Sequence, residues 1–161
     1  MTPAINLLKK KKATHQVLKY EHDPAAPSYG LEACEKLHLD PATVFKTLVA
    51  ETDKQQWVVC IIPVQDKLSM KAVAKAAGAK KAAMAAPADV ERTTGYILGG
   101  VSPLGQKKRL PVFIHHSAQN LEKMHVSAGR RGLEVGLKPS DLSALTAATF
   151  HPLTVSSEDN G

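Results

Sequence analysis

Trp57-Val58-Val59-Cys60-Ile61-Ile62-Pro63 is the strongest strand signal in this chain, and it decides the fold. Its apolar side chains fall on both alternating faces, which is typical of a strand that is covered on both sides. We therefore expect this strand near the centre of a sheet, with other elements packed over each face.

Weaker signals on either side of this strand predict the remaining elements. Helices are expected where a capping residue or a proline precedes an apolar stripe. The predicted strands are 15–20, 44–51, 111–116, 123–127 and 132–137, with an ambiguous one at 82–85, and the predicted helices are 2–11, 31–37, 68–77, 89–94 and one that begins near 138–141. Six or seven strands and about five short helices in irregular order predict a mixed α/β or α+β domain.

The composition is that of one globular domain, with 43% hydrophobic and 22% charged residues in a chain of 161. We assign residues 1–155 to this domain and 156–161 to a frayed polar tail. No apolar stretch approaches the roughly 20 residues of a membrane span, and we see no signal peptide. Cys34 and Cys60 lie in apolar segments, so we expect reduced core thiols in a cytoplasmic protein.

The basic residues form clusters, and the formal net charge is +6. Solvated surface is the commonest role of lysine, but several clusters on a small domain favour a polyanionic partner. Aromatic content of 4% argues against a base-stacking platform of the RRM or OB type. Three lysines spaced four residues apart would share one face of a helix. The candidate nucleic-acid-binding residues are Lys67, Lys71, Lys75, Lys107, Lys108, Arg109, Arg130 and Arg131.

The segment Thr94–Gln106, with the sequence TGYILGGVSPLGQ, contains four of the ten glycines. Glycine permits positive φ and close approach of a ligand, so successive N–H groups of such a loop can converge on an anion. A hairpin with a bulge between two strands is the alternative interpretation.

Lys46 stands among apolar neighbours in the predicted strand 44–51, on the same face as Val44 and Leu48. A lysine there is costly unless it is paired or belongs to a site, although its side chain could also extend to water at the strand end. Glu134 follows a second glycine loop, and the sequence leaves two readings open. It is either a surface residue or a contact for a substrate ammonium group.

The common catalytic and metal-binding motifs are absent, including H-E-x-x-H, paired C-x-x-C, G-x-S-x-G, the Walker A lysine and the zinc-deaminase pattern. His115 and His116 should point to opposite faces of a strand and so cannot chelate one metal together. We expect no metal, no cofactor and no Ser–His or Cys–His catalytic pair.

Several segments together resemble the bacterial YbaK family: Met1–Ala4, Tyr20–Pro24, Phe45–Leu48, Ser102–Pro111 and Ser127–Leu133. The string Ser-Pro-Leu-Gly-Gln-Lys-Lys-Arg-Leu-Pro is the most specific of these. The family comprises free-standing Cys-tRNA(Pro) deacylases related to the editing domain inserted in bacterial prolyl-tRNA synthetase, and the similarity covers about residues 1–155.

The resemblance implies a single mixed, mostly antiparallel, barrel-like sheet surrounded by short helices, and a cytoplasmic enzyme that hydrolyses cysteine wrongly esterified to proline tRNA. It makes Lys46 the central catalytic residue. In relatives, position 29 is often Phe and position 134 often Asp. The substrate-binding residues that the resemblance implies are Tyr20, Tyr29, Thr47, Gly99, Gly100, Val101, Ser102, Pro103, Ser127, Gly129 and Glu134.

An aminoacyl ester is already activated, so such an enzyme needs positioning and charge stabilisation more than a protein nucleophile. The nucleophile could be the substrate's own thiol, a water molecule or the terminal ribose hydroxyl. The expected partners are aminoacyl-tRNA and prolyl-tRNA synthetase, with no membrane and no DNA. The alternatives are a non-catalytic tRNA-binding or synthetase-associated module, and a small-molecule or nucleotide-binding domain.

Overall fold

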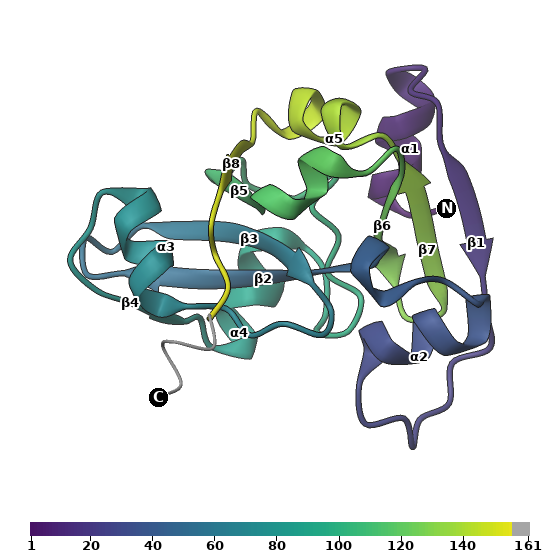
Figure 1. The fold of residues 1–161 in the computed structure, drawn as a ribbon, viewed down its shortest axis with the longest axis horizontal. Coiled ribbons are helices and arrows are strands. Elements are labelled where there is room, and N and C mark those ends of the chain that lie inside the picture. The colour runs from purple at the N-terminus through teal and green to yellow at the C-terminus, as the bar shows by residue number, and fades with distance from the viewer. Residues whose placement is uncertain (156–161) are drawn as a thin grey trace.

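Eight strands form two sheets in the computed structural model, which describes residues 1–155 (Figure 1). The strands are β1 (Gln16–Lys19), β2 (Phe45–Thr52), β3 (Trp57–Pro63), β4 (Ala82–Met84), β5 (Val112–His115), β6 (Met124–Arg130), β7 (Leu133–Leu137) and β8 (Thr149–His151). The larger sheet has the order β4-β2-β3-β5-β8 and the smaller one β1-β7-β6. The predicted central position of β3 is therefore confirmed.

The predicted mixture of mostly antiparallel strands is confirmed, but the barrel is not closed. Both pairs of the small sheet and both pairs made by β2 are antiparallel, whereas β3–β5 and β5–β8 are parallel. The two sheets meet at Val44, which forms a parallel bridge with His125 of β6. The predicted strand count of six or seven misses β8, a three-residue strand that is held by its pairing with β5 rather than by a local pattern.

Five short α-helices and two 3₁₀ turns cover the sheets (Figure 1). They are α1 (Pro3–Lys10), α2 (Tyr29–Leu37), α3 (Met70–Ala77), α4 (Pro87–Thr94), α5 (Pro139–Thr146), η1 (Pro41–Thr43) and η2 (His116–Asn120). Ser69 caps α3 by accepting a hydrogen bond from the Ala72 N–H at 3.1 Å, so this helix begins two residues later than predicted. Lys67 consequently lies outside the helix and does not share a helical face with Lys71 and Lys75.

The two faces of β3 contact different hydrophobic cores. Val59 and Ile61 pack with α1 and the small sheet, whereas Val58 and Cys60 pack with residues of α3. No helix within residues 1–155 has both the length and the apolar character needed to cross a membrane. The predicted polar tail, 156–161, lies outside the described residues.

Candidate active site

A cavity of about 310 Å³ lies where β2 runs from the larger sheet toward the smaller one. Four segments surround it: the chain leading into α2, the first half of β2, the glycine-rich loop, and the β6–β7 pair. Its volume is at the lower end of the range for ligand pockets, so it suits a small ligand group. Its lining consists of Pro27, Ser28, Tyr29, Gly30, Val44, Phe45, Lys46, Thr47, Leu48, Leu98, Gly99, Val101, Ser127 and Glu134.

Seven of the residues that the resemblance implied line this one cavity, although they come from separate parts of the chain. These are Tyr29, Lys46, Thr47, Gly99, Val101, Ser127 and Glu134. The other five implied residues do not line it. They are Tyr20, Gly100, Ser102, Pro103 and Gly129.

Glu134 lies in β7, opposite Ser127 of β6, and its side chain faces the cavity. Only 7% of the residue is exposed, and Oε2 is buried with no hydrogen-bond partner. Burial disfavours the charged carboxylate and raises the pKa of Glu134 to about 8. A carboxyl group held in this way binds a cation readily, because an ammonium group supplies both the missing donor and the compensating charge. The surface interpretation of Glu134 is therefore wrong.

Thr47 provides a second unpartnered polar atom in the same cavity. Its Oγ1 is buried without a hydrogen-bond partner. The main chain of β2 is also open beside Thr47. β4 pairs with residues 50–52 of β2, and at the end of this pairing the Val49 carbonyl accepts the Ala85 N–H. The edge of β2 that faces away from β3 therefore has no paired strand before Val49 within the described residues. Because alternate strand residues point their N–H and C=O groups the same way, the N–H of Thr47 faces away from β3, toward the open edge.

Lys46 lines the cavity from the opposite face of β2 and is half-buried. Within residues 1–155 its ammonium group makes no ion pair. Burial lowers the pKa of Lys46, and the charge of Asp66 partly offsets this effect. An unpaired ammonium group at the edge of a cavity can bind an anionic or developing negative charge of a ligand.

The glycine-rich loop joins α4 to β5, so it is not a hairpin between two strands. Its own side chains hold its shape: Tyr96 Oη donates to the Leu104 carbonyl at 2.6 Å, and Ser102 Oγ accepts from the Leu104 N–H at 3.2 Å. Pro103 lines a different hollow, beside α1 and α5. Gly100 is pressed against Arg130, whose Cα would lie 2.8 Å from an added Cβ. Ser102, Pro103 and Gly100 therefore shape the loop, and only Leu98, Gly99 and Val101 reach the cavity.

Gly129 and Tyr20 lie just outside the cavity. A Cβ on Gly129 would meet the Tyr96 ring at 2.8 Å, while its N–H donates to Ser127 Oγ at 3.2 Å and orients that hydroxyl. The Tyr20 N–H donates to the carbonyl of Gly132, two residues before Glu134, at 3.0 Å, and burial, followed by the charge of Glu134, raises the pKa of Tyr20 to about 12. Gly129 thus contacts the cavity through Ser127, which lines it.

Several lining residues were missed because their types carry no chemical signal. Pro27 and Ser28 belong to the chain that leads into α2, Gly30 lies in its first turn, and Leu98 is an exposed leucine beside a glycine. The apolar pattern of the predicted strand 44–51 contained Val44, Phe45 and Leu48, but nothing in that pattern shows which part of the strand lacks a neighbouring strand.

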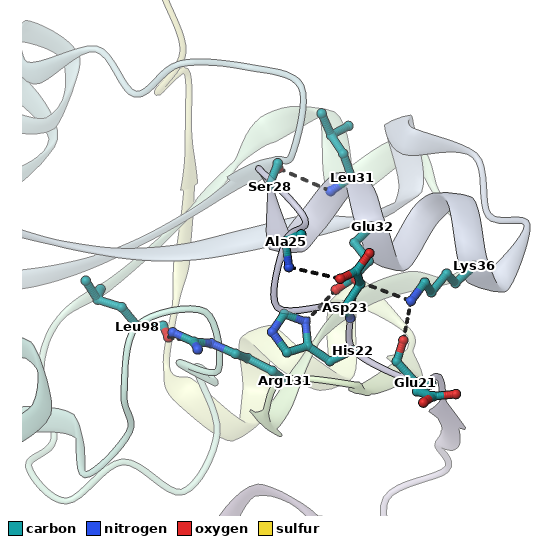
Figure 2. Close-up of polar contacts among 10 residues, drawn as sticks. All are labelled: Glu21, His22, Asp23, Ala25, Ser28, Leu31, Glu32, Lys36, Leu98 and Arg131. Carbon is teal, nitrogen blue, oxygen red and sulfur yellow. Dashed lines mark hydrogen bonds and ion pairs between the residues drawn. The ribbon is translucent and has the colours of Figure 1, made fainter.

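Figure 2 shows how the chain before α2 is held in place. The buried Glu32 carboxylate accepts from His22 Nδ1 and from the Asp23 N–H, both at 2.7 Å, and contacts Lys36 Nζ at 3.3 Å. These hydrogen bonds, together with the Lys36 contact, lower the pKa of Glu32 against the opposing effect of its burial. The network fixes the segment that carries Tyr29 to the cavity entrance.

The comparisons with known proteins agree with this geometry. A model of the aminoacyl-tRNA editing domain matches residues 23–145, which include every residue of the cavity lining. The chain belongs to the aminoacyl-tRNA editing domain family. This confirms the resemblance seen in the sequence. EbsC of Enterococcus faecalis, described provisionally as a Cys-tRNA(Pro)/Cys-tRNA(Cys) deacylase, is 42% identical over 120 residues, covering 74% of this chain and 73% of EbsC.

Solved structures share the fold of this editing domain. A protein described provisionally as a trans-editing enzyme for prolyl-tRNA synthetase has a TM-score of 0.81 at 20% identity, covering 97% of this chain and 99% of that one. A hypothetical protein has a TM-score of 0.85 at 20% identity, covering 96% of this chain and all of the other. These matches support the two-sheet α+β architecture.

The basic residues of the editing domain are spread over separate places on the surface. Lys71 and Lys75 line a hollow beside α3, and Lys108 and Arg109 line another beside α1 and α5. Arg130 is exposed at the β6–β7 turn, but the Arg131 guanidinium group donates to the Leu98 carbonyl at the cavity entrance.

Within residues 1–155, no group of three or more His, Cys, Asp or Glu residues is arranged to hold a metal ion. His116 lies in η2 rather than in a strand, and its ring centroid is 4.6 Å from that of His115.

Proposed function

We propose that this editing domain removes cysteine from mischarged Cys-tRNA(Pro), with the aminoacyl group bound in the cavity between β2 and β7. The observation that carries the proposal is the pair of unpartnered buried polar atoms, Glu134 Oε2 and Thr47 Oγ1, in one small cavity. Buried polar atoms normally have hydrogen-bond partners, so two such atoms without partners in one cavity indicate a polar ligand. The name of the 42%-identical relative supports the choice of cysteine and of proline tRNA.

The α-ammonium group of the substrate is assigned to Glu134. Burial raises the pKa of this carboxyl group to about 8, so it is mostly protonated at pH 7. An ammonium group beside it stabilises the ionised form and lowers that pKa. A charge-assisted hydrogen bond of this kind is worth about 1.5–3 kcal/mol.

The cavity lining offers no activated protein nucleophile. Among residues 1–155 no histidine and no cysteine line the cavity, and Ser127 Oγ already accepts a hydrogen bond from the Gly129 N–H. Burial raises the pKa of Cys60 to about 12, so this thiol is inert at neutral pH. We therefore propose that the nucleophile comes from outside the protein, and of the three candidates we favour the substrate's own thiol because it is part of the bound aminoacyl group.

In this reaction the substrate sulfur attacks its own ester carbonyl carbon, and the bond from that carbon to the ribose oxygen breaks. The thiol proton passes to the ribose oxygen, giving free tRNA and a cysteine thiolactone. Negative charge develops on the carbonyl oxygen, where the Lys46 ammonium and the N–H of Thr47 can stabilise it. Attack by water is the competing route and gives free cysteine.

The test is release of labelled amino acid from proline tRNA charged with cysteine, serine or alanine. Cysteine and serine differ little in size, and pocket fit alone discriminates only about 10- to 200-fold. A stronger preference for cysteine supports attack by the thiol, whereas comparable rates for cysteine and serine refute that step. We expect Lys46→Ala to lose most activity and Lys54→Ala, at the exposed β2–β3 turn, to keep it. If wild type binds the tRNA and leaves every ester intact, the protein is a binding module.

Recognition of proline tRNA requires more than this small domain presents around its cavity. We propose that prolyl-tRNA synthetase supplies the charged tRNA, and that its phosphates are bound by the two basic clusters already described, Lys71 with Lys75 and Lys108 with Arg109. The solved structure described as a trans-editing enzyme for that synthetase supports this choice of partner. Co-purification of the two proteins with proline tRNA, and loss of the complex as salt rises, would test it.

A further inference from the structure

Arg131 lies at the β6–β7 turn, and its guanidinium group points toward Leu98 of the glycine-rich loop (Figure 2), a residue that lines the cavity. Nε and Nη2 both donate to the Leu98 carbonyl oxygen, at 3.2 and 2.8 Å. The guanidinium carbon also lies 4.4 Å from the centroid of the Tyr29 ring, which is a cation–π contact. One planar group thus bridges the glycine-rich loop and the start of α2, which both border the cavity.

Gly99 shows how tightly these three segments fit together. Its φ is +86°, and a Cβ there would lie 2.6 Å from Arg131 Nε and 2.7 Å from Tyr29 Cε2. A methyl group can occupy this space only if the loop or one of these two side chains moves. The position of the loop is therefore coupled to that of the Arg131 side chain.

The Tyr29 ring also has a neighbour that does not involve Arg131. The His22 ring lies 5.6 Å from it, and His22 is itself bonded to the buried Glu32 carboxylate. Loss of the Arg131 contacts would thus leave Tyr29 supported and free mainly the Leu98–Gly99 segment. That segment forms part of the cavity wall. Arg131 lies in the turn between β6 and β7, and β7 carries Glu134, which lines the same cavity.

We infer that Arg131 is a positioning residue that fixes the width of the cavity entrance, and not a phosphate contact as its charge suggested. The inference rests on the proposed function. A lysine at this position keeps the charge but cannot donate twice to one carbonyl oxygen in a plane while stacking on a ring. Charge and geometry are therefore separable by a single conservative substitution.

The first arm of the test compares Arg131→Ala and Arg131→Lys in deacylation of Cys-tRNA(Pro). Both variants should lower kcat by about tenfold or more and to a similar extent. The slope of log Kd against log salt for tRNA binding should stay at the wild-type value. Lys123→Ala removes an exposed cation near the start of β6 and should leave kcat unchanged. Full activity in Arg131→Lys, or a salt slope reduced by about 1 in Arg131→Ala, would overturn the inference.

The second arm needs no catalysis. Hydrogen–deuterium exchange of a peptide covering residues 96–101 reports on the loop, in which the Gly100 N–H donates to the Ile97 carbonyl at 3.0 Å. Both Arg131 variants should exchange faster there than wild type, and Lys123→Ala should not. Unchanged exchange in the Arg131 variants refutes the positioning role. If wild type hydrolyses no ester, the proposed function fails while this exchange measurement still decides the inference.

Discussion

Glu134→Gln measures how much the buried carboxyl group of the cavity contributes to the free energy of unfolding at each pH. The folded protein holds the pKa of Glu134 at about 8, against an ordinary value of 4.5. Between these two values the unfolded chain has lost the proton and the folded chain has kept it. The contribution of Glu134 to stability is therefore fully present below pH 4.5 and is lost as pH rises through 8. At 1.36 kcal/mol per pKa unit, the total loss is about 5 kcal/mol.

The assay is urea denaturation of wild type and Glu134→Gln from pH 4 to 9, followed by circular dichroism. All other titrating groups are common to both proteins, so they cancel in the difference between the two unfolding free energies. The free energy of unfolding of the glutamine variant, relative to that of wild type, should rise by about 1.4 kcal/mol per pH unit between pH 4.5 and 8. Above pH 8 the difference should stay constant. Any cost of burying the amide is the same at every pH.

Glu32→Gln provides the control of opposite sign. The hydrogen bonds to the Glu32 carboxylate lower its pKa, so its contribution to stability is present above pH 4.5 and is lost as pH falls. Wild type should therefore lose its advantage over this variant in acid. A pH-independent difference between wild type and Glu134→Gln from 4.5 to 8 would refute the buried, unpaired state of Glu134.

Three further predictions concern the cavity. Thr47→Val replaces a buried, unpartnered hydroxyl, so the free energy of unfolding should stay the same or rise by about 1 kcal/mol while deacylation slows; a clear loss of stability would mean that the hydroxyl is bonded. Gly99→Ala adds a methyl group that meets two side chains at the cavity entrance and should lower both stability and activity, whereas Gly78→Ala, with positive φ and nothing within 4 Å, should lower stability alone; equal activities would place Gly99 outside the site. Binding of a non-hydrolysable aminoacyl analogue at pH 7 should release a proton from Glu134, seen as a calorimetric enthalpy that changes with the buffer, and no buffer dependence would separate the ligand from this carboxyl group.

Local patterns predicted the elements well, and non-local pairing accounts for most of the errors. The continuous apolar run of β3 was sufficient to place it centrally, because few other arrangements bury both faces. Closure of the sheet depended instead on where Val44 meets His125, which are far apart in the sequence. The helix carrying Lys71 and Lys75 was predicted, but Ser69 sets its start and excludes Lys67.

The candidate site was predicted as a set of residues and only partly as an arrangement. Lys46 and Thr47 are neighbours in sequence, and both line the cavity because the edge of β2 is open there. Consecutive loop residues cannot all face one cavity, so Gly100 instead packs against the neighbouring hairpin. The charge of Arg131 was visible in the sequence, but its contact with Tyr29 depends on three segments that meet only in the fold.

The central claim is that the cavity between β2 and β7 is where the ester is cleaved. Single-turnover release of cysteine from Cys-tRNA(Pro), measured with wild type and Glu134→Gln at pH 7, tests it most directly. Loss of one charge-assisted contact predicts release that is about 10- to 100-fold slower in the variant, with unchanged affinity for uncharged tRNA. Equal rates of release in the two proteins would contradict the assignment of this cavity as the active site.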